Sequence, residues 1–207
     1  MENFNIEQKI AKVISILFDP FIIPTWGFIL LLLSPFYFST FLIFQAKLFI
    51  LAIVFVSTFI VPVFTKGLIK YFSHNEIDFS NRKDRLLLFL ITAVSYYIGY
   101  TFLKQMIFFS SFKIFLISAA ITILLLLLIS SKWKISVQTA GIGGLTGIYL
   151  ALCFRLYLNA ILPVCILFLI CGMVGTSRLI LKRHTPAQIY AGFLLGFITN
   201  FAIIMYF

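Results

Sequence analysis

Residues 159–207 read NAILPVCILFLICGMVGTSRLILKRHTPAQIYAGFLLGFITNFAIIMYF, two apolar runs joined by a short basic segment. Each run contains the roughly 20 apolar residues that a helix needs to cross the hydrocarbon core of a bilayer. The basic segment around their junction includes Arg178, Lys182, Arg183 and His184. Because charge is costly in lipid, this pattern predicts two membrane-spanning helices with a basic, His-bearing connection at the membrane edge.

Five more runs of this kind precede it, at 20–38, 46–66, 86–104, 112–131 and 137–157. Hydrophobic residues make up 62% of the chain and charged residues 11%, which excludes an ordinary soluble domain. All acidic residues lie outside the seven runs, and this argues against a proton-coupled pump. We therefore predict an all-α, polytopic transmembrane helix bundle with six to seven spans.

The first 18 residues differ from the rest of the chain. Apolar side chains recur there at helical spacing, with charged residues between them: Ile6, Ile10, Val13, Ile14 and Leu17 against Glu7, Lys9 and Lys12. This period is typical of an amphipathic helix that lies in the membrane interface. We predict an interfacial helix over residues 1–18 and a single membrane domain over 19–207.

Positive charge collects on one side of the predicted bundle. The formal net charge is +10, and an alternating path through seven spans places most Lys and Arg residues on the side of the N-terminus. The usual bias of these residues would make that side cytoplasmic, unless part of the excess binds phosphate. Membrane lipids with anionic head groups are the partners that this charge predicts, and no nucleic-acid partner is expected.

Three polar clusters fall on this basic side, at residues 81–85, 132–138 and 177–184. Bundling would bring their cations to one membrane depth, where the planar fork of arginine suits phosphate. Ser136 precedes a new apolar run, so it can cap that helix and leave Lys134 facing an anion. Alternatively, Lys134 and its neighbour Trp133 are ordinary interfacial anchors.

His184 stands directly before a helix-start signal, Thr185-Pro186-Ala187-Gln188. Thr as N-cap, Pro at the first helical position and Gln at the third form a capping box. The imidazole is thus expected at the membrane edge, where it can act as a nucleophile or simply be a polar interface residue.

Glycines are concentrated in two of the predicted spans: Gly141, Gly143, Gly144 and Gly147 in one, Gly192 and Gly196 in the other. Small residues at this spacing allow transmembrane backbones to approach closely. We therefore expect helix packing there rather than a phosphate loop. The cysteines lack metal-ligand spacing, and no metal or other cofactor is predicted.

The ordered clusters resemble the motifs of the type 2 phosphatidic acid phosphatase superfamily, in a compact bacterial membrane form with altered motifs. The third family motif is Ser-Arg, five residues, His, three residues, Asp, and it matches Ser177, Arg178 and His184, with Gln188 at the last position. The resemblance implies that His184 is the nucleophile that forms a phosphohistidine. It also implies that Arg178 binds phosphate and that Gln188 either orients the imidazole or caps the helix.

The other two motifs are less complete. Pro-Ser-Gly-His falls on residues 135–138, which keep the phosphate-binding Ser136 and place Gln138 where the family has its general acid. Lys, six residues, Arg-Pro falls on residues 78–86 and keeps only Arg85. By resemblance Arg85, Ser136 and Arg178 are phosphate-binding residues, and Lys134, which matches no motif position, is added to them as a substitute for the missing lysine of the first motif. A multi-pass protein of a bacterial inner membrane is implied.

Three functions follow as hypotheses. The preferred one is binding of a lipid phosphate or polyprenyl (di)phosphate head group with phosphatase activity weak or lost, because Gln138 cannot give a proton to the leaving group. The second is an active phosphatase that uses a phosphohistidine intermediate. The third is a non-catalytic subunit of a membrane complex, with a membrane protein as partner.

Overall fold

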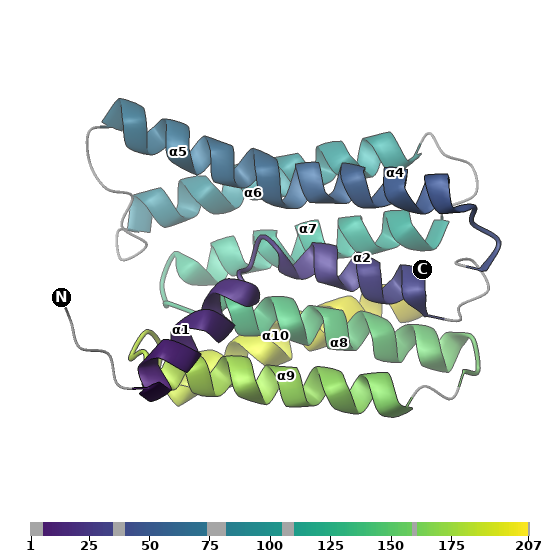
Figure 1. Cartoon of the computed structure of the whole chain (residues 1–207). Helices are drawn as coiled ribbons and strands as arrows, with labels where there is room; N and C mark the ends of the chain where they lie inside the picture. The colour runs from purple at the N-terminus through teal and green to yellow at the C-terminus, as the bar shows by residue number, and fades with distance from the viewer. Residues whose placement is uncertain (1–5, 35–39, 74–81, 105–109, 159–160, 207) are drawn as a thin grey trace. The chain divides into compact units, whose positions relative to one another are not determined.

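The computed structural model describes residues 6–34, 40–73, 82–104, 110–158 and 161–206, and it does not describe the side chains of 69–73, 82–85, 110 and 111. Within these ranges every regular element is a helix (Figure 1). The elements are α1 (Ile6–Leu17), α2 (Ile23–Leu33), α4 (Phe44–Phe55), a π-helix (Val56–Ile60), α5 (Val61–Ser73), α6 (Arg82–Lys104), α7 (Ser110–Ser130), α8 (Val137–Arg155), α9 (Ile161–Ile180) and α10 (Pro186–Tyr206).

Six helices of the described chain are long and apolar enough to cross a membrane. The first of them runs from α4 through the π-helix into α5, over Phe44–Leu68, and the others coincide with α6 to α10 almost end to end. The predicted all-α, multi-pass membrane architecture is therefore confirmed, with boundaries within a few residues of those expected.

The predicted run 20–38 is different, because its described helix α2 has only 11 residues. At 1.5 Å per residue such a helix is about 16 Å long, roughly half the thickness of the hydrocarbon core. The start of α2 is delayed by a turn in which the N–H groups of Ile22 and Ile23 donate to Asp19 O. Its described part ends before Ser34, and Ser34 precedes a proline in the sequence, a position that disfavours helical backbone.

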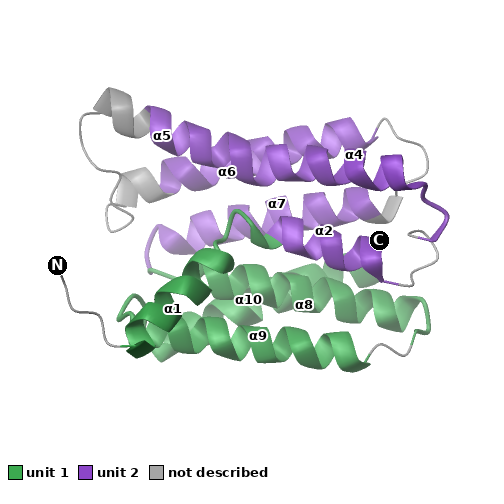
Figure 2. Ribbon diagram, in the orientation of Figure 1, with its two compact units in different colours: residues 1–23, 134–206 green, residues 24–133, 207 purple. Residues whose placement is uncertain are grey.

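The chain divides into two compact units (Figure 2). Unit 1 comprises residues 1–23 and 134–206, with α1, α8, α9 and α10, whereas unit 2 comprises residues 24–133, with the helices from α2 to α7. Unit 1 therefore contains most of the polar cluster at 132–138 and all of the cluster at 177–184. The expected division into an interfacial helix over 1–18 and one domain over 19–207 stays a prediction.

Glycine makes the central contact of unit 1, between α8 and α10. A Cβ at Gly196 would overlap the carbonyl oxygen of Ala140, and a Cβ at Gly143 would overlap that of Phe193. A Cβ at Gly147 would lie 2.5 Å from Phe197 O. The two backbones thus touch directly, as expected for small residues in membrane helices, and the predicted packing role of the glycines is confirmed.

Helix α1 packs against α9 and leaves an apolar stripe exposed. Ala11 is buried, and Ile14 packs on a small core made by Ile23, Ile142 and Val174. The side chains that the sequence predicted for the apolar face are largely exposed: Ile6, Ile10, Val13 and Leu17. The described part of the leader is therefore the predicted amphipathic helix, with a face available to lipid.

In unit 2 the π-helix is explained by a proline in the next turn. Pro62 has no N–H and its ring would clash with the carbonyl of Thr58 in a regular helix. The wider turn is stabilised by a buried hydroxyl, because Ser95 Oγ donates to Ser57 O at 2.8 Å. One long span can thus contain a proline without breaking.

The glycine contact gives the first prediction. Gly196→Ala should lower the free energy of unfolding by about 2 kcal/mol, because the added methyl meets backbone that cannot move aside. Gly172→Ala on α9 is the matched control, since a Cβ there meets nothing within 4 Å, and it should be neutral or stabilising by up to about 1 kcal/mol. Equilibrium unfolding in detergent measures both, and equal effects would refute the backbone contact.

Candidate functional site

The N-terminal ends of α8 and α10 meet, and this brings two polar clusters together. Ser136 N–H donates to Gln188 O at 3.2 Å, and Thr139 Oγ1 donates to Ile189 O at 3.1 Å. Gly192 permits the approach, because a Cβ there would overlap Ser136 O. These contacts join the start of α8 to residues just after the cluster at 177–184, and Lys134 of the cluster at 132–138 is close enough to act electrostatically on His184.

The end of α9 then turns the chain back toward this point. Arg183 N–H donates to Arg178 O at 3.1 Å and Lys182 N–H donates to Leu179 O at 2.9 Å. Lys182 itself has a φ of 51°, so these two hydrogen bonds form a Schellman motif with lysine at the left-handed position that glycine usually occupies. This reversal places Arg183 and His184 beside the last turn of α9.

The imidazole of His184 is oriented by the helix cap that follows it. Gln188 Oε1 accepts the backbone N–H of Thr185 at 3.1 Å, and the same oxygen lies 3.2 Å from His184 Nδ1. The bond from the Thr185 N–H identifies this atom as the amide oxygen, which can only accept hydrogen bonds. Nδ1 therefore carries the proton in its contact with Gln188. The lone pair of the neutral ring is therefore on Nε2, and Gln188 has both of its predicted positions at once, helix cap and orienting partner.

Burial and neighbouring cations keep this imidazole neutral. Burial is the largest cause that lowers the pKa of His184, to about 4, and the positive charge of Arg178 is the next. The hydrogen bond to Gln188 raises the pKa in part, whereas the charges of Lys134 and Arg183 lower it further. Three cations are thus close enough to act on one neutral, half-buried ring.

Arg178 has more hydrogen-bonding capacity than the described residues use. Its Nη1 donates to Ser15 Oγ of α1 at 2.7 Å, while its buried Nε has no partner among the described residues. A buried donor without an acceptor is costly. The guanidinium is therefore poised to take another acceptor from a ligand.

Ser136 occupies the N-cap position of α8, with extended backbone at φ −81° and ψ 108°. Its hydroxyl makes no cap hydrogen bond, so the predicted side-chain cap is wrong. The side chain is fully buried, and its Oγ has no partner within the described part of the chain. Position and burial fit the phosphate-binding role that the resemblance implies, but the hydroxyl is not used to start the helix.

Gln138 is directed at the end of α1. Its Nε2 donates to Ser15 O at 2.7 Å and to Phe18 O at 3.0 Å, and these carbonyls belong to the C-terminal end of a helix, where acceptors lack intrahelical partners. Both amide hydrogens are used in this way. At the position of the family's general acid, the chain therefore has a structural amide that fixes α1.

The cations of the predicted site are divided between described and undescribed residues. Lys134 is exposed and close enough to act on His184. Arg85 belongs to α6 in unit 2, and its side chain lies outside the described residues. No group of three or more potential metal ligands occurs in the described ranges.

Sequence reasoning missed Ser15, Phe18 and Asp19, and it named Arg183 as part of the basic segment without giving it a role in the site. Ser15 and Arg178 are 163 residues apart, and no spacing rule connects them. One signal was available, since Gln8, Ala11 and Ser15 form a small or polar stripe opposite the apolar residues of the leader. Such a stripe suits a helix that packs on protein with one face and on lipid with the other.

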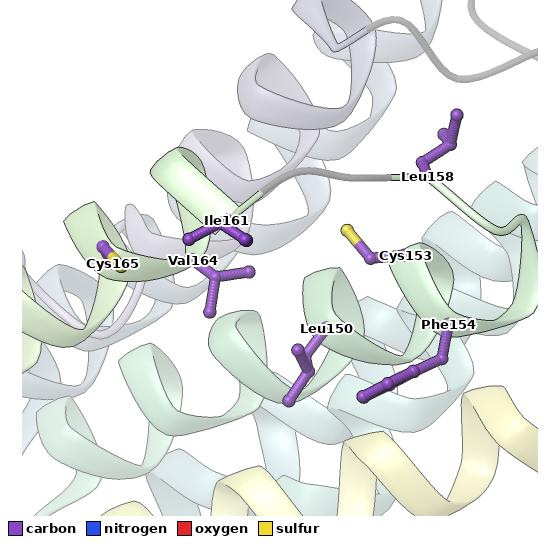
Figure 3. A pocket seen from close by; sticks show the side chains of 7 residues that line it. All are labelled: Leu150, Cys153, Phe154, Leu158, Ile161, Val164 and Cys165. Atoms are coloured by element: carbon purple, nitrogen blue, oxygen red, sulfur yellow. The ribbon is translucent and has the colours of Figure 1, made fainter.

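An apolar pocket lies at the opposite end of α8, with a volume of about 230 Å³. Figure 3 shows the side chains that line it, which come from the end of α8, the start of α9 and the connection between them: Leu150, Cys153, Phe154, Leu158, Ile161, Val164 and Cys165. No charged side chain lines it. This pocket is therefore separate from the polar cluster around His184 and contributes no charged side chain to it.

Comparison with protein-family models, with curated proteins and with solved structures gives no match. Inference about function therefore rests on the residues of the site.

The Schellman motif gives the second prediction. Lys182→Gly should raise the free energy of unfolding by about 1 kcal/mol, because glycine adopts the left-handed conformation without the steric cost that lysine has. Lys182→Ala is the control, since it removes the same charge but keeps that cost, and it should not stabilise the protein. Thermal unfolding in detergent compares them, and equal stabilisation by both would point to charge instead.

The third prediction concerns the protonation of His184. NMR titration should give a midpoint near pH 4, far below the ordinary 6.5, and Arg178→Gln should raise it by removing a neighbouring positive charge. Between pH 6.5 and 4 the unfolded chain binds a proton that the folded chain does not, so folding stability falls as the pH is lowered through that window. His184→Ala identifies the resonance, because the chain has one other histidine. A midpoint at 6.5 or above would contradict the described environment.

Proposed function

We propose that this multi-pass membrane protein binds the phosphate of a lipid phosphate or polyprenyl (di)phosphate head group, with phosphatase activity weak or lost. The observation that carries the proposal is one cluster: Ser136 Oγ and Arg178 Nε, buried and without a partner among the described residues, together with a neutral imidazole on which Arg178 and two further cations act. Such donors suit a phosphate group, which offers several acceptor oxygens and negative charge. The motif resemblance to the type 2 phosphatidic acid phosphatase superfamily supports the same ligand class.

Loss of turnover is inferred from Gln138. In a phosphohistidine mechanism His184 Nε2 would form a bond to phosphorus while the bond to the leaving oxygen breaks, and that oxygen must receive a proton. An amide has no proton of useful acidity to give, and general acid catalysis is typically worth 10²–10⁴-fold. The described hydrogen bonds of Gln138 to α1 support a structural role for it instead.

The arrangement of His184 favours the active alternative. A neutral ring with its lone pair on Nε2, held by Gln188, is the form that a nucleophilic histidine needs. A diphosphate has a better leaving group than a monoester, so it would depend less on the missing acid. Turnover of a polyprenyl diphosphate is therefore the activity expected if the protein is an enzyme of a bacterial inner membrane. A non-catalytic subunit that uses its basic face for a membrane protein partner remains the third candidate.

The fourth prediction tests binding and turnover together. The detergent-purified chain should bind dioctanoyl phosphatidate and farnesyl diphosphate in preference to dioctanoylglycerol and farnesol. Arg178→Gln should reduce that preference about 10-fold or more, because a charge-assisted hydrogen bond contributes about 1.5–3 kcal/mol. Thr176→Val is the matched control on the same helix, since the exposed Thr176 hydroxyl donates to Gly172 O within α9.

Phosphate release from the same lipids separates the candidates. Weak or no release by the native chain, with release gained in Gln138→His, fits a phosphate site that lacks its acid. Release that disappears in His184→Ala establishes the active phosphatase instead. Equal binding of phosphorylated and dephosphorylated lipids would refute both and leave the non-catalytic subunit.

A further inference from the structure

The C-terminal end of α1 lies on the same donors that the proposed ligand would use. Arg178 Nη1 donates to Ser15 Oγ at 2.7 Å, and the two amide hydrogens of Gln138 go to Ser15 O and Phe18 O. Ser15 Oγ also lies 3.5 Å from Gln138 Oε1. Thus one turn of α1 occupies donors from both clusters of the site.

The groups of α1 that contact these donors resemble an anion, because they are acceptors with full or partial negative charge. The last carbonyls of a helix have partial negative charge, and two of them accept from Gln138. The hydroxyl oxygen of Ser15 accepts from Arg178, and the carboxylate of Asp19 is near enough to interact electrostatically with the same guanidinium. A hydroxyl of α1 therefore occupies one donor of Arg178, a carboxylate acts on the same guanidinium, and two carbonyls occupy the amide of Gln138.

We propose that α1 is a displaceable cover whose C-terminal end occupies the place of the phosphate anion, so that ligand binding and α1 docking compete for Arg178. This inference depends on the proposed function, and it adds regulation to that site. Within the described part of the chain, Ser136 Oγ and Arg178 Nε are buried and have no partner, so α1 leaves donors unused that a phosphate can take.

The contacts of α1 allow such a movement. Of its 12 residues only Ala11 is buried, and a helix this short has little stability of its own apart from its surroundings. Its exposed stripe of Ile6, Ile10, Val13 and Leu17 is apolar and Lys9 beside it is exposed. After release α1 can therefore remain at the membrane interface, tethered by the turn in which Asp19 Oδ1 accepts Phe21 N–H at 3.0 Å.

The fifth prediction concerns two substitutions that weaken the docking of α1 and leave the proposed phosphate-binding residues unchanged. Ser15→Ala removes the acceptor on Arg178, and Asp19→Asn removes the negative charge while an amide oxygen can still accept Phe21 N–H. Each should tighten binding of dioctanoyl phosphatidate about 10-fold, in line with the strength of hydrogen bonds to charged groups. Thr176→Val, which removes a hydroxyl two residues from Arg178 without touching α1, should leave the affinity unchanged.

A distance measurement between α1 and α9 tests directly whether α1 moves away when ligand binds. Spin labels at Lys9→Cys on α1 and Leu179→Cys on α9, both exposed positions, should move apart when dioctanoyl phosphatidate is added, in a background without the native cysteines. Inorganic phosphate is a second arm, because displacement by it would show that the phosphate group alone suffices. In Arg178→Gln neither ligand should shift the distance.

The outcomes separate the two proposals. Preference for phosphatidate over dioctanoylglycerol, with affinity unchanged in Ser15→Ala and Asp19→Asn and no change of distance, would overturn the cover and leave the phosphate site standing. Equal binding of the two lipids by the native chain and by both variants would overturn the phosphate site, and the cover with it. Tighter binding in both variants together with a longer label distance supports the cover.

Discussion

The site depends on direct backbone contact between α8 and α10. Gly143, Gly147 and Gly196 remove the side chains that would hold these helices apart, and the register that results lets Ser136 N–H reach Gln188 O. That hydrogen bond joins one polar cluster to the cap of α10, and the cap in turn orients His184. A shift of either helix would separate the serine from the imidazole, so packing inside the membrane determines chemistry at its edge.

Features encoded locally were predictable from the sequence. Long apolar runs gave the spans, the Thr185 to Gln188 signal placed the start of α10, and glycine spacing indicated which two helices pack closely, because each signal depends on residues within a few turns of one another. The run predicted at 20–38 begins as a helix only at Ile23, since hydropathy alone does not register the turn at Asp19, and residues 35–38 lie outside the described residues. Ser136 was correctly predicted at the N-cap position of α8, but its hydroxyl does not make the cap hydrogen bond that was expected.

Contacts between distant parts of the chain were not predictable in this way. The docking of Ser15 on Arg178 joins helices 163 residues apart, and one sequence contains no periodicity that specifies it. Gln138 illustrates the same limit, because as a motif residue it suggests an altered acid, whereas in the fold it holds the end of α1. Family motifs describe chemistry at a position, but the partner of a side chain is decided by tertiary packing.

The length of α8 determines how far apart its basic end and its apolar end lie in the membrane. Its 19 residues make a helix of about 28 Å, close to the full thickness of the hydrocarbon core. The basic site is at its first residues and the apolar pocket of Figure 3 at its last. The two ends of α8 are therefore separated by about the thickness of that core, so the basic end and the apolar pocket cannot both lie at one surface of the membrane.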